Sequence, residues 1–125
     1  MKKQKIMEHT IKNNIDFNEF LSIQEKLDIR VGLILSCERV PKSKKLVKLN
    51  VLFESDDIKT VVTNLGEKFE PEVFVNEKAL FVVNIVPSTM MGITSEAMIL
   101  AAESIYSKDR VSFSLNDYLV GSKVL

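Results

Sequence analysis

A basic stretch in the first half of the chain carries the clearest potential for binding chemistry. Five cations lie between residues 39 and 48 with no acidic residue among them: Arg39, Lys42, Lys44, Lys45 and Lys48. Taken alone, such a run is most often a solvated surface loop. Between two strands of a binding fold it can instead face a phosphate backbone. On that placement we expect Lys42, Lys44 and Lys45 to contact phosphate, with Lys45 the best single candidate.

The overall charge gives no support to bulk electrostatic binding. The 125 residues include 17 basic and 17 acidic side chains, so the formal net charge is zero. Domains that bind nucleic acid through their net charge are strongly basic. Any binding to a polyanion must therefore rest on the local basic stretch.

Polar side chains flank two apolar segments further along the chain. Asn84 follows one segment and Ser95 precedes the next. Both side chains can hydrogen-bond a base or ribose edge, and both can equally satisfy loop backbone groups, so the two interpretations stay open. Glu96 would repel phosphate, and we expect it to orient Arg30 or a backbone amide as structural support.

Three methionines in the same region offer polarizable apolar surface: Met90, Met91 and Met98. Methionine is more often core filler than a binding platform. Met91 precedes Gly92 in a predicted loop, where a platform under a base and a filler are equally good interpretations. From its surroundings we expect Met98 to lie in the core.

The chain contains no recognisable catalytic constellation. His9 and Cys37 are the single residues of their types, and neither has a nucleophile or base partner nearby in sequence. There is no Gly-rich phosphate loop, paired acid motif or metal-ligand spacing. We therefore expect no enzyme activity, no cofactor and no metal. A lone cysteine, and no apolar stretch typical of a signal peptide or membrane span, favour a cytoplasmic protein.

The amino-terminal region divides into an arm and a helix. Residues 1–15 are rich in Lys and Asn and read as a mobile arm or an accessory helix. Asp16 followed by Glu19 is typical of a capping box, which predicts a helix over residues 16–25. Phe17, Phe20 and Leu21 would share one side of it.

From residue 28 the hydrophobic period indicates strands. They are predicted over residues 28–38, 45–53, 58–63, 79–83 and 97–102, with weaker terminal strands at 111–115 and 123–125. Pro71 predicts a single helical turn, and residues 86–95 are predicted to be a loop. Five main strands with a short helix between the third and fourth are the outline of a mainly all-β, five-stranded Greek-key OB-fold barrel over residues 16–125. Such barrels bind oligonucleotides or oligosaccharides.

Three groups of residues, in this order, resemble the tRNA-binding domain family. They are Asp28-Ile29-Arg30-Val31-Gly32, then Pro41 with Lys45-Leu46, and the long segment from Asn84 to Ala102 that includes Met90-Met91-Gly92 and Ser95-Glu96-Ala97-Met98. The family occurs at the carboxyl end of bacterial methionyl-tRNA synthetases and as free-standing dimers. The resemblance runs from about Phe17 to Leu125.

The resemblance implies a tRNA-facing edge and a rim. The edge would carry Asn84, Met91, Ser95, Glu96 and Met98, and the neighbouring rim would carry Lys45. Ser88 and Thr89 stand where many members have a basic pair, and residues 62–66 differ from the usual Val-Ser-Gly, so fewer phosphate contacts are expected.

The family also implies function and partners. We expect a non-catalytic protein that recognises tRNA by shape and backbone, and that assists an aminoacyl-tRNA synthetase of the methionyl type. It would form a homodimer through the amino-terminal helix and terminal strands. The alternative is a dimeric, chaperone-like module of the same fold that binds protein, which the neutral charge and the methionines also suit.

Overall fold

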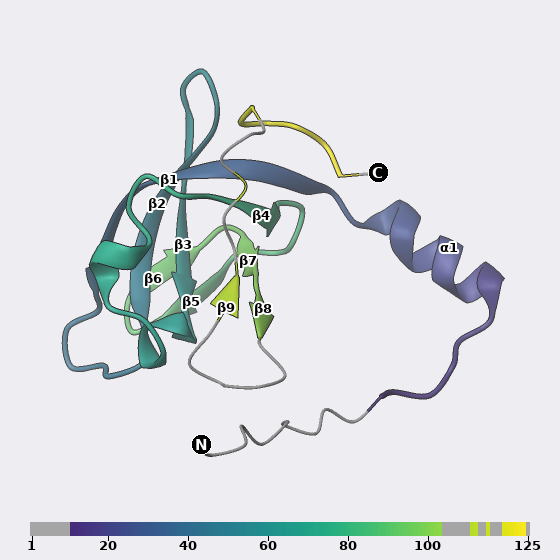
Figure 1. The fold of residues 1–125 in the computed structure, drawn as a ribbon, viewed down its shortest axis with the longest axis horizontal. Helices are drawn as coiled ribbons and strands as arrows, with labels where there is room; N and C mark the ends of the chain where they lie inside the picture. The colour runs from purple at the N-terminus through teal and green to yellow at the C-terminus, as the bar shows by residue number, and fades with distance from the viewer. Residues whose placement is uncertain (1–10, 104–110, 113–114, 116–118, 125) are drawn as a thin grey trace, which may run out of the picture.

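Alternating apolar residues build an antiparallel sheet that curls into a half-barrel in the computed structural model (Figure 1). The structure describes residues 11–103, 111–112, 115 and 119–124. The strand order in the five-stranded sheet is β3-β2-β1-β4-β7. The strands are β1 (Ile29–Arg39), β2 (Val47–Glu54), β3 (Asp57–Thr63), β4 (Lys78–Val82) and β7 (Met98–Leu100). The predicted OB-type barrel is thus confirmed, within one or two residues at most strand ends.

The concave side of the sheet holds the core. In β2 every second residue is buried, and Val47, Leu49 and Val51 are fully inaccessible to solvent. Phe53 continues this row and meets Phe81 of β4 edge to face, with ring centroids 5.3 Å apart. Because strand side chains alternate between faces, this row explains why residues 45–53 read so clearly as a strand.

Strand β1 needs glycine where it crosses the core. A Cβ at Gly32 would lie 2.5 Å from Val51 Cγ1 and 2.9 Å from Phe53 Cε1. The edge of β1 that β2 leaves free at this end is covered as well, because Val31 exchanges backbone hydrogen bonds with Gly121 and Ser122. The predicted terminal strand at 123–125 is reduced here to one bridge between Arg30 and Lys123.

The predicted amino-terminal helix is present as α1 (Phe17–Lys26) and extends away from the barrel (Figure 1). Asp16 caps it, since its Oδ1 accepts a hydrogen bond from the Glu19 N–H at 2.8 Å. No residue of α1 is buried, and Phe17 is 70% exposed. Residues 11–16 before it carry neither helix nor strand, and residues 1–10 of the predicted arm lie outside the described part.

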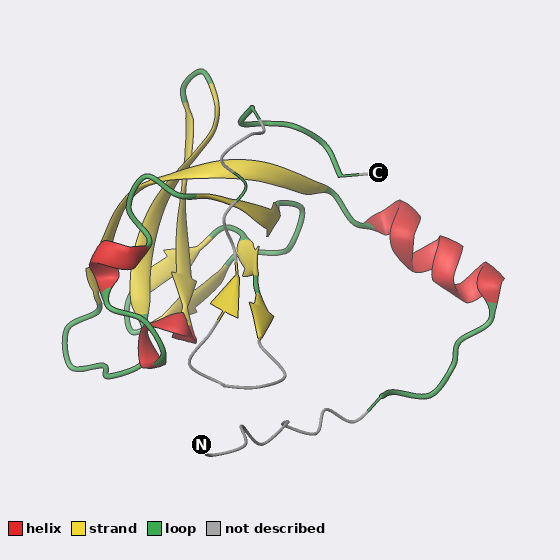
Figure 2. Ribbon diagram, viewed as in Figure 1, coloured by secondary structure: helices red, strands yellow, loops and turns green. Residues whose placement is uncertain are grey.

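The segment predicted to be a loop contains a small hairpin, so that prediction was wrong. Strands β5 (Ser88–Met90) and β6 (Ile93–Ser95) pair with each other in a second sheet (Figure 2). Met91 and Gly92 both have positive φ, 50° and 81°, which is the conformation of a type I′ turn. Three-residue strands joined through a methionine carry no recognisable hairpin signal in sequence.

Short elements complete the fold. Two 3-10 turns, η1 (Asn64–Glu67) and the predicted η2 (Pro71–Val73), connect β3 to β4. Beyond β7, β8 (Ala102–Glu103) pairs with β9 (Val111–Ser112), so the predicted strand at 97–102 is split in two. Residues 113 and 114 of the predicted strand 111–115 lie outside the described part. No helix in the described ranges is long and apolar enough to cross a membrane.

Candidate nucleic-acid interface

The connection between β1 and β2, residues 40–46, forms a closed loop that we call the lysine loop. Its base is fixed where the Val40 N–H donates to Leu46 O at 3.0 Å, and Val40 itself is buried. Ser43 Oγ accepts from the Leu46 N–H at 3.0 Å. The loop therefore has a defined path that projects its lysines outward. The exposed side chains are those of Pro41, Lys42, Lys44 and Lys45.

Arg39 anchors this loop instead of adding a free cation to it. Its Nη1 donates to Lys44 O at 3.0 Å and to Gly66 O at 2.9 Å, and its Nη2 lies 3.2 Å from Glu70 Oε2. Gly66 allows this close approach, because a Cβ there would lie 2.7 Å from Lys45 O. Sequence reasoning counted Arg39 among the cations and missed its positioning role, for which no local motif exists.

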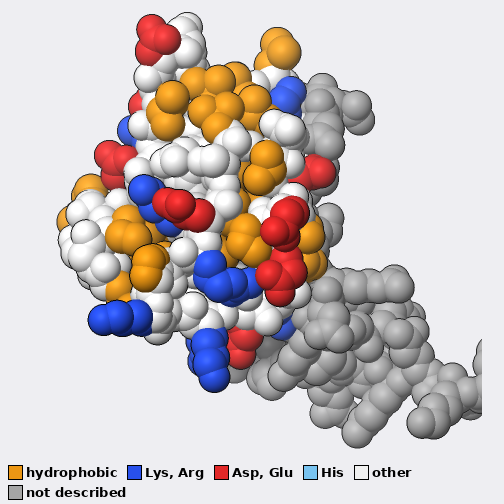
Figure 3. Space-filling view, turned by 90° about the vertical axis from the view of Figure 1, so that its left-hand side faces the viewer, with side chains coloured by type: hydrophobic (Ala, Val, Ile, Leu, Met, Phe, Trp, Pro, Cys, Tyr) orange, Lys and Arg blue, Asp and Glu red, His pale blue; other side chains and the backbone are white. Residues whose placement is uncertain are grey.

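Three of the five cations of the basic stretch have no ion-pair partner in the described part of the chain. Arg39 is engaged as described, and Lys48 Nζ lies 3.6 Å from Glu38 Oε1. Among the described residues, no acidic side chain pairs with the three lysines of the loop. Most of the Lys and Arg side chains visible on this side of the barrel lie in its lower half, with acidic side chains between and above them (Figure 3). The positive surface is local, as the neutral net charge requires.

The Met91 turn lies toward the same end of the barrel. Strand β6 runs beside β3, since Ser95 contacts Val62 and Glu96 contacts Thr60. From Ser95 toward Met91, the hairpin runs in the direction of Thr63, the last residue of β3. Thr63 pairs with Val47, directly after the lysine loop. Met91 is 55% exposed at the turn, so apolar surface and three lysines share one end of the molecule.

Two predicted site residues beside β3 are engaged inside the protein. Ser95 is 3% exposed; its Oγ accepts from the Val62 N–H at 2.9 Å and donates to Ala97 O at 3.0 Å. This corrects the expected direct contact of Ser95 with tRNA, because its hydroxyl is buried and satisfied. Glu96 Oε2 accepts from the Thr60 N–H at 2.8 Å. Its partner is a backbone amide and not Arg30.

Asn84 and Arg30 lie at the opposite end of the barrel. Asn84 Oδ1 accepts from the Asp28 N–H at 2.9 Å, and its Nδ2 donates to Lys26 O at 2.6 Å. Of the two interpretations of Asn84, the structure places it on backbone groups, where it ties the end of β4 to the junction of α1 and β1. This role leaves one N–H of the amide without a described partner.

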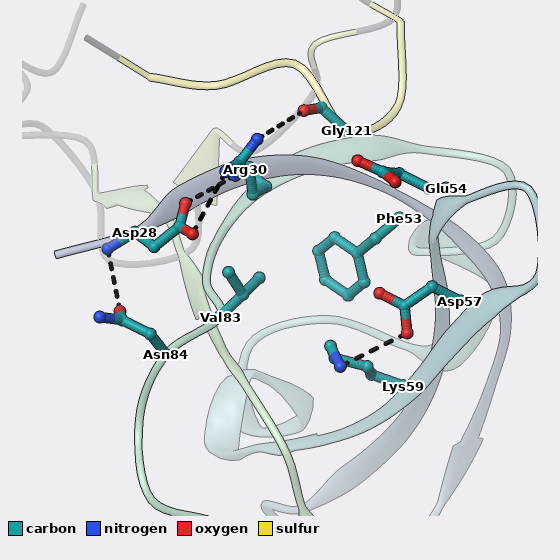
Figure 4. Close-up of a pocket in the computed structure, with 9 residues that line it drawn as sticks. All are labelled: Asp28, Arg30, Phe53, Glu54, Asp57, Lys59, Val83, Asn84 and Gly121. Atoms are coloured by element: carbon teal, nitrogen blue, oxygen red, sulfur yellow. Dashed lines mark hydrogen bonds and ion pairs between the residues drawn. The ribbon is translucent and has the colours of Figure 1, made fainter.

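Arg30 is held by its neighbours at the same end. Its Nε donates to Asp28 Oδ1 at 2.6 Å, and its Nη1 lies 3.4 Å from Gly121 O. The hydrogen bond from Arg30 lowers the pKa of the Asp28 carboxyl and raises the pKa of Arg30 itself. These residues line a pocket of about 290 Å³ between β1, the β2–β3 hairpin, the end of β4 and the C-terminal segment (Figure 4).

Met98 faces outward on β7 and is 42% exposed, so the expectation that it lies in the core was wrong. It pairs in register with Val82 of β4, and Leu100, 37% exposed, lies on the same face. A three-residue edge strand gives too short an alternation to fix which face is buried. Met98 is therefore exposed, but it does not lie beside Met91.

The described residues offer no evident site for metal or thiol chemistry. No group of three or more His, Cys, Asp or Glu side chains in these ranges could hold a metal ion. Cys37 is partly buried, and desolvation raises the pKa of its thiol to about 11. A thiol with this pKa is almost entirely protonated at neutral pH and is a poor nucleophile.

Comparison with protein families and curated proteins gives consistent matches. The family model described as "Putative tRNA binding domain" matches residues 29–122. A methionine–tRNA ligase of Parabacteroides distasonis is 36% identical over 114 residues, and one of Phocaeicola vulgatus is 40% identical over 115 residues; each alignment covers 91% of this chain. The chain spans only 16% of the length of these relatives.

Solved structures share the fold over almost the whole chain. A MetRS-related protein from Pyrococcus horikoshii has a TM-score of 0.74 and 30% identity, with 91% of this chain and 100% of that chain covered. The CsaA chaperone protein from Picrophilus torridus has a TM-score of 0.72 and 25% identity, covering 90% of this chain and 100% of that one.

Proposed function

Because this chain belongs to the family of tRNA-binding domains, we propose that it binds tRNA and catalyses no reaction on it. The observation that carries the proposal is the lysine loop, whose three exposed lysines have no acidic partner among the described residues. Ammonium groups in a fixed loop beside an OB-type sheet suit the phosphate backbone of RNA. The binding residues proposed there are Lys42, Lys44, Lys45 and Met91.

Recognition would rest on shape and backbone. The lysine loop follows Arg39, and Asn84 lies near Arg30 at the opposite end of the barrel. Arg30 and Arg39 are nine residues apart on β1. At about 3.3 Å per residue, these ends are roughly 25–30 Å apart. A ligand that contacts both must span at least this distance, and a tRNA is large enough to do so. Met98, on the outer face, would contact the ligand only if the tRNA wraps beyond the barrel end.

We further propose that the chain assists an aminoacyl-tRNA synthetase of the methionyl type in the cytoplasm. The support is its similarity to part of two methionine–tRNA ligases and to a MetRS-related protein. A separate tRNA-binding module raises the effective concentration of tRNA near its partner without any new contact to the catalytic site. The module would thus deliver or retain tRNA.

The direct test is binding of total tRNA to the purified chain across a salt series, with double-stranded DNA of similar length as competitor. We expect salt-dependent binding, micromolar or tighter, that DNA does not displace, because shape distinguishes the two polyanions. Absence of tRNA binding even at low salt would contradict the proposal.

A homodimer is proposed for the same protein. The support is the apolar side of α1 and its C-cap residue, where Phe17, Phe20, Ile23 and Leu27 are each at least 45% exposed in the described structure. A helix face of this kind is normally buried against a partner, and a second copy would offer the same face. Light scattering should give twice the monomer mass, and Phe20→Asp should give the monomer. A monomeric wild-type chain would refute the dimer.

Protein binding is a second candidate, favoured by the likeness to the CsaA chaperone protein. The exposed Met91, Met98 and Val86 would supply adaptable apolar surface for an unfolded chain. Lys45→Ala distinguishes the two functions. It should weaken tRNA binding and leave binding of an unfolded peptide unchanged if the primary proposal holds, whereas tight peptide binding without tRNA binding would favour the chaperone-like function.

A further inference from the structure

The pocket at the Arg30 end of the barrel has the size of a site for a single ring system. Its volume is about 290 Å³, at the lower limit of ligand pockets, which begin at about 300 Å³. Four segments surround it: the start of β1, the β2–β3 hairpin, the end of β4 and the turn at Gly121 (Figure 4). A small, multi-walled pocket of this kind suits one flat group of a larger ligand.

Two apolar side chains form the floor of the pocket. The ring of Phe53 and the side chain of Val83 point into the same space (Figure 4). Phe53 is almost fully buried and is fixed by its edge-to-face contact with Phe81. An aromatic edge and a branched aliphatic group provide the kind of surface against which a planar ring packs.

The rim of the pocket carries both signs of charge, and most of its groups are already held. Arg30 is paired with Asp28, and Lys59 Nζ lies 3.4 Å from Asp57 Oδ1. Glu54 is the exception, because no described residue forms a hydrogen bond or ion pair with its carboxylate. Three carboxylates against two cations disfavour a phosphate here. The free acceptor at Glu54 favours a neutral group with N–H donors.

We infer that this pocket takes one unstacked nucleobase that carries an exocyclic amino group, namely adenine, cytosine or guanine. The inference rests on the proposed function, since the base would belong to a bound tRNA. The amino group donates to the Glu54 carboxylate, the Lys59 ammonium donates to a ring nitrogen or carbonyl, and the ring packs on Phe53 and Val83. Uracil lacks the amino group and would bind more weakly.

The separation between the pocket and the lysine loop supports different roles for the two sites. Phosphate contacts position a nucleic acid, whereas contacts to base edges carry specificity. Single-stranded loops and ends of RNA present bases that can leave the stack and enter a pocket. With the lysines at one end of the barrel and the pocket at the other, one tRNA can supply phosphates to the first and a base to the second.

The test is a ¹⁵N NMR titration of the full chain with adenosine, cytidine, guanosine and uridine, which contain no phosphate. We expect adenosine, cytidine or guanosine to shift the Gly121 backbone amide and the Asn84 side-chain amide, and to leave the lysine loop unchanged. Uridine should bind at least several-fold more weakly. No shift with any amino-bearing nucleoside, or equal binding of uridine, would overturn the inference.

A matched pair of variants distinguishes binding in the pocket from a general effect of the protein's charge. Glu54→Gln and Asp56→Asn each remove one negative charge from the same hairpin, but only Glu54 lines the pocket. Glu54→Gln keeps an acceptor oxygen but makes it neutral, and this weaker hydrogen bond should reduce nucleoside affinity roughly fivefold to tenfold. Asp56→Asn should bind like the wild type. Equal effects of the two variants would show that charge alone acts and would refute the site.

Two further measurements keep this inference distinct from the proposed function. On the same samples, salt-dependent tRNA binding without nucleoside shifts would leave the function standing and refute the pocket, whereas loss of both would refute the function as well. Lysine amide, an ammonium probe for a peptide side chain, is the competing ligand. If it shifts the pocket resonances more strongly than every nucleoside does, the site is one for protein and the nucleobase assignment fails.

Discussion

Ser95 uses both hydrogen-bonding functions of its hydroxyl inside the protein, and this determines what its removal should do. Ser95→Ala leaves the Val62 N–H and the Ala97 carbonyl without this partner in a buried place. An unsatisfied buried polar group costs about 1–3 kcal/mol. We therefore expect a decrease of that size in the free energy of unfolding, measured by urea denaturation, with tRNA affinity unchanged in the folded protein.

The matched control for Ser95 is its partner in register. Ser88 pairs with Ser95 across the β5–β6 hairpin but is exposed. Ser88→Ala should change stability by less than about 0.5 kcal/mol, because exposed substitutions rarely do more. If Ser95→Ala lost tRNA affinity while keeping wild-type stability, the result would favour the direct contact with tRNA that the family resemblance implies for Ser95.

Cys37 provides a prediction about pH. Burial raises the pKa of its thiol to about 11, from an ordinary value of 9.0. Near pH 8 the native thiolate fraction should be roughly a hundredfold below that of the unfolded chain, so alkylation by iodoacetamide should slow by a similar factor. The chain in guanidinium chloride is the control, and equal native and denatured rates would contradict the burial.

The same shift in the pKa of Cys37 has a consequence for stability. Because the folded state holds the thiol proton more tightly, this group's contribution to stability is complete below about pH 9. It is lost as the pH rises from there through about 11. Asp28 behaves in the opposite sense: its folded pKa is lowered, so its contribution is present at neutral pH and is lost in acid.

At the scale of elements, the lysine loop depends on Arg39. Arg39→Lys keeps the charge but cannot reproduce a planar group that reaches Lys44 O, Gly66 O and Glu70 together. We expect faster hydrogen exchange of the Val40 and Leu46 amides and roughly threefold to tenfold weaker tRNA binding. An unchanged exchange rate and affinity would mean that only the charge of Arg39 matters.

How well each element was predictable depended on its length and period. The eight-residue β2 and the ten-residue α1 repeat their pattern several times and carry cap or turn residues, so sequence alone predicted them. The β5–β6 hairpin has three residues a side, and its turn places a methionine at positive φ. Only pairing between strands selects that conformation, and no local propensity indicates it.

Prediction of the candidate site from sequence was limited in the same way. That the lysines between the first two strands are exposed followed from charge, and so did the expectation that Glu96 holds a group of the protein, although its partner was left open between Arg30 and a backbone amide. The roles of Arg39, Ser95 and Asn84 did not, because each of them has a partner that lies 27 or more residues away along the chain. Such contacts depend on how the barrel closes, which composition and period do not encode.

At the scale of the whole molecule, the barrel separates two kinds of surface. The lysine loop and the Met91 turn lie at one end, and the mixed-charge pocket beside Arg30 lies at the other. This arrangement allows a chain of zero net charge to bind a polyanion, since the favourable charges are collected where phosphates would lie. We therefore expect the lysine loop to carry the salt-dependent part of tRNA binding.

The decisive measurement is the salt dependence of tRNA affinity in a triple variant of the loop. Each phosphate contact contributes about 0.9 to the slope of log K against log salt in duplex nucleic acid, and about 0.7 in single strands. Changing the three lysines of the loop to alanine should therefore reduce the slope by roughly 2–3. The variant combines Lys42→Ala, Lys44→Ala and Lys45→Ala.

A charge-matched control removes three exposed lysines far from the loop: Lys12, Lys26 and Lys123. Both variants lower the net charge equally, so general electrostatics would change the two slopes alike. We predict a large reduction of the slope in the loop variant and a clearly smaller one in the control. If the loop variant kept the wild-type slope and affinity, the lysine loop would not be the phosphate-binding surface.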